Sequence, residues 1–287
     1  MAIRQVVLIR GLGHSGSTIL DLALGSHPRM LGLGEAVRIL RTPQPGEERR
    51  GPARLRADLR HQRLCTCGLT ASRCLVWGEL LEWLPENEDR PLLDKFRYLL
   101  TRVSAYIQTQ EPSVEWVVES YQDDLHIPLQ DIHGLDVRII MLVRDVRSWV
   151  HSRIRDAERK GVSHNAIHSL ARWCWVNRRF ERDLGRCGKP VFVLGYEELA
   201  LQPERMLALL CEWLGLEFSP LMLSPSGATK SHVLAGNRMR FEPEKCRQIR
   251  YDSAWMHGEA WPASPAMLIP FVGRMNRRLV YSHRDLN

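Results

Sequence analysis

The stretch Val6-Val7-Leu8-Ile9-Arg10-Gly11-Leu12-Gly13-His14-Ser15-Gly16-Ser17-Thr18-Ile19-Leu20 decides the fold that we expect. Its first residues are aliphatic and mostly β-branched, which predicts a buried strand, and its glycines mark a tight turn. A helix should follow and end at Gly25, with Pro28 just beyond. A glycine-rich loop between a strand and a helix N-terminus offers backbone N–H groups and the positive end of the helix dipole. This arrangement predicts a phosphate site.

The loop matches the P-loop pattern G-x-x-x-x-G-K-[ST] except that Ser17 stands in the place of the lysine. That lysine normally reaches the β- and γ-phosphates, so its absence disfavours an ATPase, GTPase or kinase, and a divergent kinase is kept as an alternative. The hydroxyls of Ser17 and Thr18 can still donate to a 5′-phosphate. The other alternative, a connection that binds nothing, fits poorly with this many glycines and hydroxyls in one short loop.

The 287-residue chain carries 40 Lys and Arg against 33 Asp and Glu, a formal charge of +7. This excess is spread along the chain and lacks a stripe with interleaved aromatics, which disfavours nucleic acid and suits a small anionic ligand. No apolar run is long enough to span a membrane, and the first one reads as a short strand rather than a secretory leader. We therefore expect a cytoplasmic location, and the composition leaves the oligomeric state open.

Strands and helices are expected to alternate along the chain. A short apolar segment at 30–35 follows the first helix, and further strands are expected at 114–120, 137–143 and 190–195. Helices are expected at 54–84, 91–110, 145–155, 165–183 and 204–214, and a loop at 41–52. The alternation predicts an α/β fold with a parallel sheet and helices on both faces. We expect one domain, 1–287, with a helical insertion at about 38–110 near the site.

Ligands in such sheets lie beyond the carboxyl ends of the strands. The segments Gly11–Thr18, Glu119–Asp124, Arg144–Ser152 and Gly195–Glu198 all follow strands, so one composite site is expected. Arg144 would lie at a strand end and Ser152 about two helical turns further on, close enough for both to grip one phosphate. Taken alone, an unrelated surface arginine and helix-face serine would be the simpler interpretation.

These stretches resemble the sulfotransferases that use 3′-phosphoadenylyl sulfate (PAPS), in particular bacterial members. In that family a loop of the form [KR]-[SAG]-G-[ST]-[ST] and an Arg with a Ser eight positions later bind the nucleotide. The matching segments occur in the same order in this chain. They are His14–Thr18, Ser26-His27-Pro28, Cys65-Thr66-Cys67-Gly68, Arg144…Ser152, Tyr196–Leu199 and Gly236–Phe241.

The resemblance implies a P-loop-type fold and transfer of a sulfuryl group from PAPS to a hydroxyl or amine, with adenosine 3′,5′-bisphosphate (PAP) as product. The acceptor would be a small molecule or a carrier-bound intermediate, and the scheme requires no metal. It implies that His14, Ser15, Gly16, Ser17 and Thr18 hold the 5′-phosphosulfate. It further implies that Arg144 and Ser152 hold the 3′-phosphate, joined by Asn237 and Arg240, and that Tyr196 approaches the adenine.

Glu35 is the expected catalytic base. It follows His14 by twenty-one residues, and the local pattern His27-Pro28…Gly34-Glu35 is similar to that around the catalytic glutamate of the protein-tyrosine sulfotransferases. The alternatives are a solvated loop carboxylate and a cap for the helix that starts at Ala36. His14 is expected to join Glu35 in catalysis as a hydrogen-bond donor, either protonated or as a neutral N–H.

Two positions depart from the family pattern. His14 stands where most members have Lys or Arg, and Gln122 stands where many have Lys. Arg10, Arg147 or Arg240 could supply the missing charge. The departures also keep open a second interpretation, in which the protein binds nucleotide, does not catalyse and serves as a regulatory or partner-binding module.

The seven cysteines are an odd number and do not form a secreted disulfide pattern. Cys65, Cys67 and Cys74 are their one cluster. As a metal site it has no clear fourth ligand, although His61 is near in sequence, and it lacks the usual C-x-x-C spacing. A packed loop with reduced thiols is the favoured interpretation, so no metal site is predicted.

Overall fold

The computed structural model describes residues 3, 5–42, 62–228, 230–257 and 263–283. The chain forms two compact units. The first comprises Met1–Ile9, Thr18–Arg138 and Ser219–Gln248, and the second Arg10–Ser17, Ile139–Phe218 and Ile249–Asn287. The expected single domain stays a prediction. Most of the expected loop at 41–52, and the first part of the expected helix at 54–84, lie outside the described residues.

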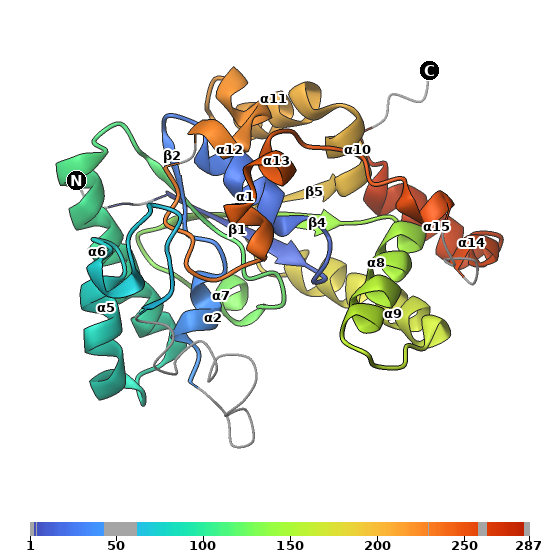
Figure 1. The fold of residues 1–287 in the computed structure, drawn as a ribbon, viewed down its shortest axis with the longest axis horizontal. Coiled ribbons are helices and arrows are strands. Elements are labelled where there is room, and N and C mark those ends of the chain that lie inside the picture. The colour runs from blue at the N-terminus through green and yellow to red at the C-terminus, as the bar shows by residue number, and fades with distance from the viewer. Residues whose placement is uncertain (1–2, 4, 43–61, 229, 258–262, 284–287) are drawn as a thin grey trace. The chain divides into compact units, whose positions relative to one another are not determined.

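Five strands form a sheet in the order β2-β3-β1-β4-β5 (Figure 1). The strands are β1 (Gln5–Gly11), β2 (Met30–Gly32), β3 (Trp116–Glu119), β4 (Asp136–Val143) and β5 (Val191–Gly195). β3 pairs in parallel with both β1 and β2, and β4 pairs in parallel with β5. The predicted α/β class with a parallel sheet is confirmed. The apolar run that ends β4 is buried throughout, which explains why its sequence does not alternate.

The first unit holds mainly short helices and one long one. They are α1 (Ser17–Gly25), α2 (Ala36–Leu40), η1 (Ala71–Arg73), α5 (Gly78–Trp83), η2 (Leu84–Asn87), α6 (Leu92–Gln110), α7 (His126–Leu129), η3 (Pro220–Leu223), α12 (Pro225–Ala228), η4 (Arg238–Phe241) and α13 (Pro243–Cys246). α6 buries Phe96, Leu99 and Val103 along one face, as its helical spacing predicts. The expected helix at 91–110 is therefore confirmed.

The expected helix at 54–84 is wrong for residues 63–77. A bridge between Leu64 and Thr70 closes a short antiparallel hairpin there, and the helix α5 begins only at Gly78. Gly68, at the turn of the hairpin, has a φ of +84°. A left-handed residue of this kind favours glycine and interrupts a helix, so the local turn outweighs the helical pattern around it.

The second unit carries β4, β5 and the longer helices that follow them. These helices are α8 (Val146–Arg159), α9 (Ala166–Leu184), α10 (Tyr196–Leu201), α11 (Pro203–Leu214), η5 (Ala254–Met256), α14 (Ala263–Ala266) and α15 (Pro270–Val280). Asp145 and Asn165 cap α8 and α9 with their side chains, and α11 ends at the left-handed Gly215. The three helices predicted in this part of the chain are confirmed to within a few residues. In Figure 1, α8 and α9 pack side by side.

None of the helices in the described ranges combines the length and the apolar character that a membrane crossing needs. The cytoplasmic location expected from the sequence stays a prediction.

Candidate functional site

The glycine-rich loop of the second unit depends on two close approaches. A Cβ on Gly11 would lie 2.2 Å from the carbonyl oxygen of Leu142 in β4, so β1 can end this close to β4 only with glycine. A Cβ on Gly16 would lie 2.4 Å from the ring of Tyr196. Both glycines also have positive φ, 150° and 93°. The predicted glycine pattern therefore serves the shape of the loop itself.

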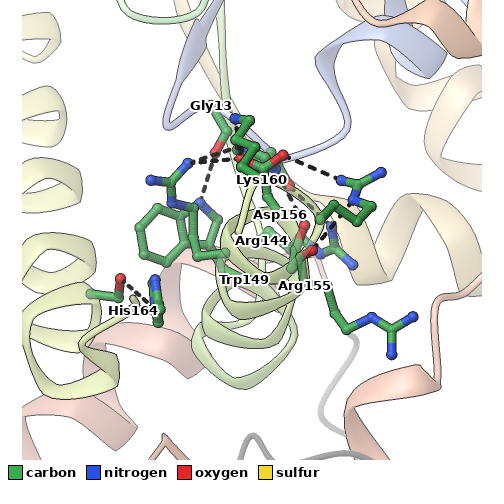
Figure 2. A network of polar contacts seen from close by, with 12 residues as sticks. Gly13, Arg144, Trp149, Arg155, Asp156, Lys160 and His164 are labelled. Carbon is green, nitrogen blue, oxygen red and sulfur yellow. Dashed lines mark hydrogen bonds and ion pairs between the residues drawn. The ribbon is translucent and has the colours of Figure 1, made fainter. Parts of the chain in front are cut away.

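Between these glycines, His14 adopts a left-handed conformation with a φ of 72°, the one positive φ among the described non-glycine residues. This conformation is sparsely populated outside glycine, and the surroundings of the loop must hold it in place. Trp149 of α8 and Arg144, which lies between β4 and α8, provide two such contacts. Trp149 donates from Nε1 to the carbonyl of Gly13 at 2.8 Å, and Arg144 donates from Nη1 to the carbonyl of His14 at 3.0 Å (Figure 2).

Arg144 lies directly after β4, and its backbone is fixed from several sides. Trp173 of α9 donates to its carbonyl at 2.9 Å. The next N–H groups, of Asp145 and Val146, donate to Glu197 at 2.8 Å and to Asn276 at 2.9 Å. The strand end that presents the Arg144 guanidinium is therefore a rigid platform.

The guanidinium of Arg144 is almost fully buried and each of its nitrogens has a partner. Nε donates to Ser148 at 2.7 Å, Nη1 to the His14 carbonyl, and Nη2 to the carboxylate of Asp252 at 2.5 Å. The ring of Tyr196 lies 5.2 Å from the guanidinium carbon. Asp252 thus occupies the outer edge of an arginine that was expected to bind phosphate.

The imidazole of His14 meets the predicted serine. Nδ1 lies 3.4 Å from the Ser152 hydroxyl, and Nε2 lies 3.1 Å from a guanidinium nitrogen of Arg153. Because arginine can only donate, Nε2 must accept, and the proton of the neutral ring is on Nδ1 facing Ser152. Burial, together with the positive charges of Arg153, Lys160 and Arg144, lowers the pKa of His14 to about 4, although Asp156 opposes this. Of the two states expected for His14, the neutral one is favoured.

The structure therefore brings His14, Gly16, Arg144, Ser152 and Tyr196 together within the second unit. Ser15 and Ser17 of the same loop are buried, and Ser17 begins α1. The Tyr196 hydroxyl donates to the carbonyl of Arg250, so the ring is pinned from the 249–257 segment. Their binding roles stay predictions.

Thr18, Glu35, Asn237 and Arg240 belong to the first unit. A Cβ on Gly236 would lie 4.0 Å from the Thr18 hydroxyl, so the 236–240 turn runs beside the start of α1. Asn237 caps η4 by accepting from Met239, and Arg240 donates to the carbonyls at 234, 236 and 237. These contacts give both side chains a structural role in the turn.

Glu35 is buried, and its carboxylate accepts a hydrogen bond from Arg38 at 2.7 Å. It makes no capping bond to α2. Glu119 does so instead, since its carboxylate accepts from the N–H of Val37 and also from that of Tyr121. Neither alternative for Glu35, a solvated loop carboxylate or a helix cap, describes this arrangement.

Arg153 and Asp252 are the two site residues that the sequence did not reveal. Arg153 brings a cation to His14, whereas the sequence offered Arg10, Arg147 and Arg240 as sources of this charge. Its position directly after Ser152 in the sequence is the one feature that could have pointed to Arg153. Arg147 pairs with Asp145, since both its Nε and its Nη2 donate to that carboxylate. Arg10 is buried within β1. No spacing rule connects Asp252 to Arg144.

Residues 135–220, which include β4, α8, α9 and β5, match the model of the sulfotransferase family. The resemblance to the sulfotransferases is confirmed. This segment carries Arg144, Ser152 and Tyr196, three of the residues that meet around the loop. The protein-tyrosine-sulfotransferase-like role of Glu35 stays a prediction.

The fold agrees with this family. The sulfotransferase domain from the Synechococcus PCC 7002 olefin synthase is 17% identical, with a TM-score of 0.50 over 96% of this chain and 95% of that one. A sulfotransferase domain from the curacin biosynthetic pathway is 16% identical, with a TM-score of 0.48 over 94% and 98%. The curated protein sequences gave no match. At this identity the first likeness supports a common sulfotransferase fold.

The contact between Gly16 and Tyr196 can be tested by substitution. Gly16→Ala should lower the free energy of unfolding by roughly 2–3 kcal/mol, because it adds a clash to a positive-φ strain of about 1 kcal/mol. Gly188→Ala is the control, since Gly188 has a φ of 69° with nothing within 4 Å of its Cβ position, and only the strain should remain. Chemical denaturation measures both. In the Tyr196→Ala background, Gly16→Ala should cost no more stability than Gly188→Ala does. A larger loss there would contradict a clash with the Tyr196 ring.

Proposed function

We propose that this protein transfers a sulfuryl group from PAPS to a hydroxyl or amine of a small-molecule or carrier-bound acceptor. One observation carries the proposal. The glycine-rich loop, the arginine at the end of β4 and the serine of α8 meet at His14, and apart from His14 itself they match the nucleotide-binding pattern of the sulfotransferases. This convergence supports one anion site, which would combine backbone N–H groups, hydroxyls and fixed cations.

The donor nucleotide would engage these groups in two places. The backbone of the loop, with the hydroxyls of Ser15, Ser17 and Thr18, would hold the 5′-phosphosulfate at the N-terminus of α1. Arg144 and Ser152 would hold the 3′-phosphate, with the Tyr196 ring toward the adenine. His14 is neutral and would donate from Nδ1, so the fixed positive charge in its place would come from Arg153.

In the proposed reaction the acceptor oxygen or nitrogen forms a bond to sulfur while the bond between sulfur and the bridging phosphate oxygen breaks. The acceptor proton passes to the Glu35 carboxylate, and PAP leaves with the bridging oxygen. The charge that develops on that oxygen needs donors already in place, which the loop supplies. The burial of Glu35 and its bond to Arg38 support a carboxylate held in one orientation.

A second interpretation keeps nucleotide binding without catalysis. The neutral His14 and the uncharged Gln122 favour it, because both stand where cations are usual. The presence of Arg153 at 3.1 Å from His14 favours catalysis instead. Turnover of PAPS with an acceptor distinguishes the enzyme from the protein that only binds nucleotide. The third alternative, a divergent kinase, would instead bind ATP with magnesium.

The donor site can be tested by calorimetry with PAP, using ATP and magnesium as the comparison. The protein should bind PAP, and Arg144→Ala should weaken it by roughly 10- to 100-fold, since charge-assisted hydrogen bonds to the phosphate are lost. The control is Arg155→Ala, an exposed arginine of the helix α8 that follows Arg144. Binding of ATP with magnesium in place of PAP would dispose of the proposal.

Removing the charge of Asp252 should strengthen PAP binding. Its carboxylate neutralises the Nη2 side of Arg144 and would repel a phosphate there, so Asp252→Asn should tighten binding by roughly 2- to 5-fold at low salt. The side-chain oxygen of asparagine can still accept from the N–H of Ala254. Asp183→Asn, a half-buried carboxylate paired with Arg179 and Arg182, serves as the control. Weaker binding in Asp252→Asn would mean that Asp252 orients Arg144 for the ligand.

Glu35→Gln should leave PAP binding nearly unchanged and lower turnover by roughly 10²- to 10⁴-fold, because the amide cannot take the acceptor proton. Turnover is followed as PAP released from PAPS with an acceptor found by screening. Glu115→Gln removes another arginine-paired carboxylate of the same unit and should keep full activity. If Glu35→Gln keeps full activity, Glu35 is not the catalytic base.

A further inference from the structure

Three cysteines and one histidine of the first unit converge on a single point. The Sγ atoms of Cys65, Cys67 and Cys74 and a ring nitrogen of His232 all lie within 4.8 Å of one another. Cys65, Cys74 and His232 are buried, whereas Cys67 is exposed. His232 is the fourth ligand that the sequence pattern lacked, and it lies more than 150 residues from the cysteines.

The distances fit a tetrahedral metal site. With Zn–S bonds of about 2.3 Å and a Zn–N bond of about 2.0 Å, tetrahedral geometry requires S···S edges of about 3.8 Å and S···N edges of about 3.5 Å. Cys74 Sγ lies 3.8 Å from both Cys65 Sγ and Cys67 Sγ. His232 Nδ1 lies 3.2 Å from Cys74 Sγ and 3.9 Å from Cys65 Sγ. These separations are far longer than the S–S bond of a disulfide, about 2.05 Å.

We propose that Cys65, Cys67, Cys74 and His232 Nδ1 bind one zinc ion. Three thiolates and one imidazole are a ligand set that zinc uses in closed, structural sites. Soft thiolates also disfavour magnesium, calcium and manganese, which prefer oxygen ligands. The exposed Cys67 gives the ion a path from solvent. This inference does not depend on the proposed function.

The backbone around the cysteines is folded to present them together. Cys65 donates its N–H to Leu69 at 2.9 Å and accepts from Gly68 at 3.0 Å, which closes the turn that carries Cys67. Further on, the N–H of Cys74 donates to Thr70 at 3.0 Å, and its carbonyl accepts from Gly78 at the start of α5. The hairpin and the following helical turn therefore aim three thiols at one point.

Polar contacts tie the hairpin to the segment that carries His232. The Thr66 hydroxyl donates to the carbonyl of Ser231 and accepts from the N–H of Val233 at 2.9 Å. The indole of Trp77 donates to the His232 carbonyl at 2.7 Å. The ligands are held by their own surroundings, as a preformed metal site requires.

The zinc ion would be structural and would stabilise the loop of Glu35. His232 donates its N–H to Gly32 at the end of β2, and Ala235 accepts from the N–H of Glu35 at 3.0 Å. A cross-link between residues 65–74 and 232 closes a long loop of the chain, which lowers the entropy of the unfolded state.

The test is zinc analysis of the full chain, purified without chelators from cells grown with added zinc. We expect about one zinc per chain. Replacement by Co(II) should give the absorption of tetrahedral cobalt and sulfur-to-cobalt charge transfer. Cys67→Ser and His232→Gln should each weaken zinc binding by at least about 100-fold, since even changes beyond the direct ligands cost about 10- to 100-fold. Cys174→Ser and Cys187→Ser are the controls and should bind zinc normally.

A chelator that removes zinc should lower the thermal midpoint of the wild-type chain, and added zinc should restore it. Folded protein with less than about a tenth of a zinc per chain and no Co(II) charge-transfer absorption would overturn the proposal. So would zinc that stays bound with unchanged affinity in folded Cys67→Ser, an exposed position where folding should survive. Because neither measurement uses a nucleotide or an acceptor, failure here leaves the sulfotransferase proposal untouched.

Discussion

The left-handed turn at His14 is the constraint on which the rest of the candidate site depends. Its φ is 72°, and the carbonyls of Gly13 and His14 accept hydrogen bonds from Trp149 of α8 and from Arg144 at the end of β4. The same turn carries the imidazole toward Ser152 and Arg153. A strained backbone conformation persists only where its surroundings over-determine it. One unusual residue therefore aligns the loop, the strand end and the helix.

The charges around this turn explain the kind of ligand that the site suits. Burial of His14, with the positive charges of Arg153 and Arg144 nearby, lowers the pKa of its imidazole to about 4 and favours the neutral ring. The countercharges of these arginines, Asp252 and Asp156, come from the protein. An anion that enters must compete with these carboxylates for the two arginines. Such a site favours a ligand with several negative oxygens over one with a single carboxylate.

The sequence predicted what local patterns encode. Continuous apolar runs predicted the buried strands, the expected helices at 145–155 and 204–214 match α8 and α11 to within a few residues, and the loop glycines predicted the turn before α1. It failed at residues 63–77, where a left-handed Gly68 interrupts a helical pattern. It also missed partners that only tertiary folding brings together. Asp252 reaches Arg144 across more than 100 residues, and His232 reaches the cysteines across more than 150, so no local spacing could have paired them.

The segment 231–235 connects the cysteine cluster with the loop of Glu35, two features of the first unit that lie apart in sequence. His232 lies beside the three cysteines, and the N–H of Val233 donates to the hydroxyl of Thr66 in the hairpin. The same segment donates to Gly32 and accepts from the N–H of Glu35. Gly34 allows this close packing, since a Cβ there would lie 2.4 Å from the Val233 side chain. A cross-link at His232 therefore acts on the backbone of Glu35 through three residues of extended chain. If zinc binds there as proposed, the cysteine cluster would help to fix the backbone position of Glu35 within the first unit.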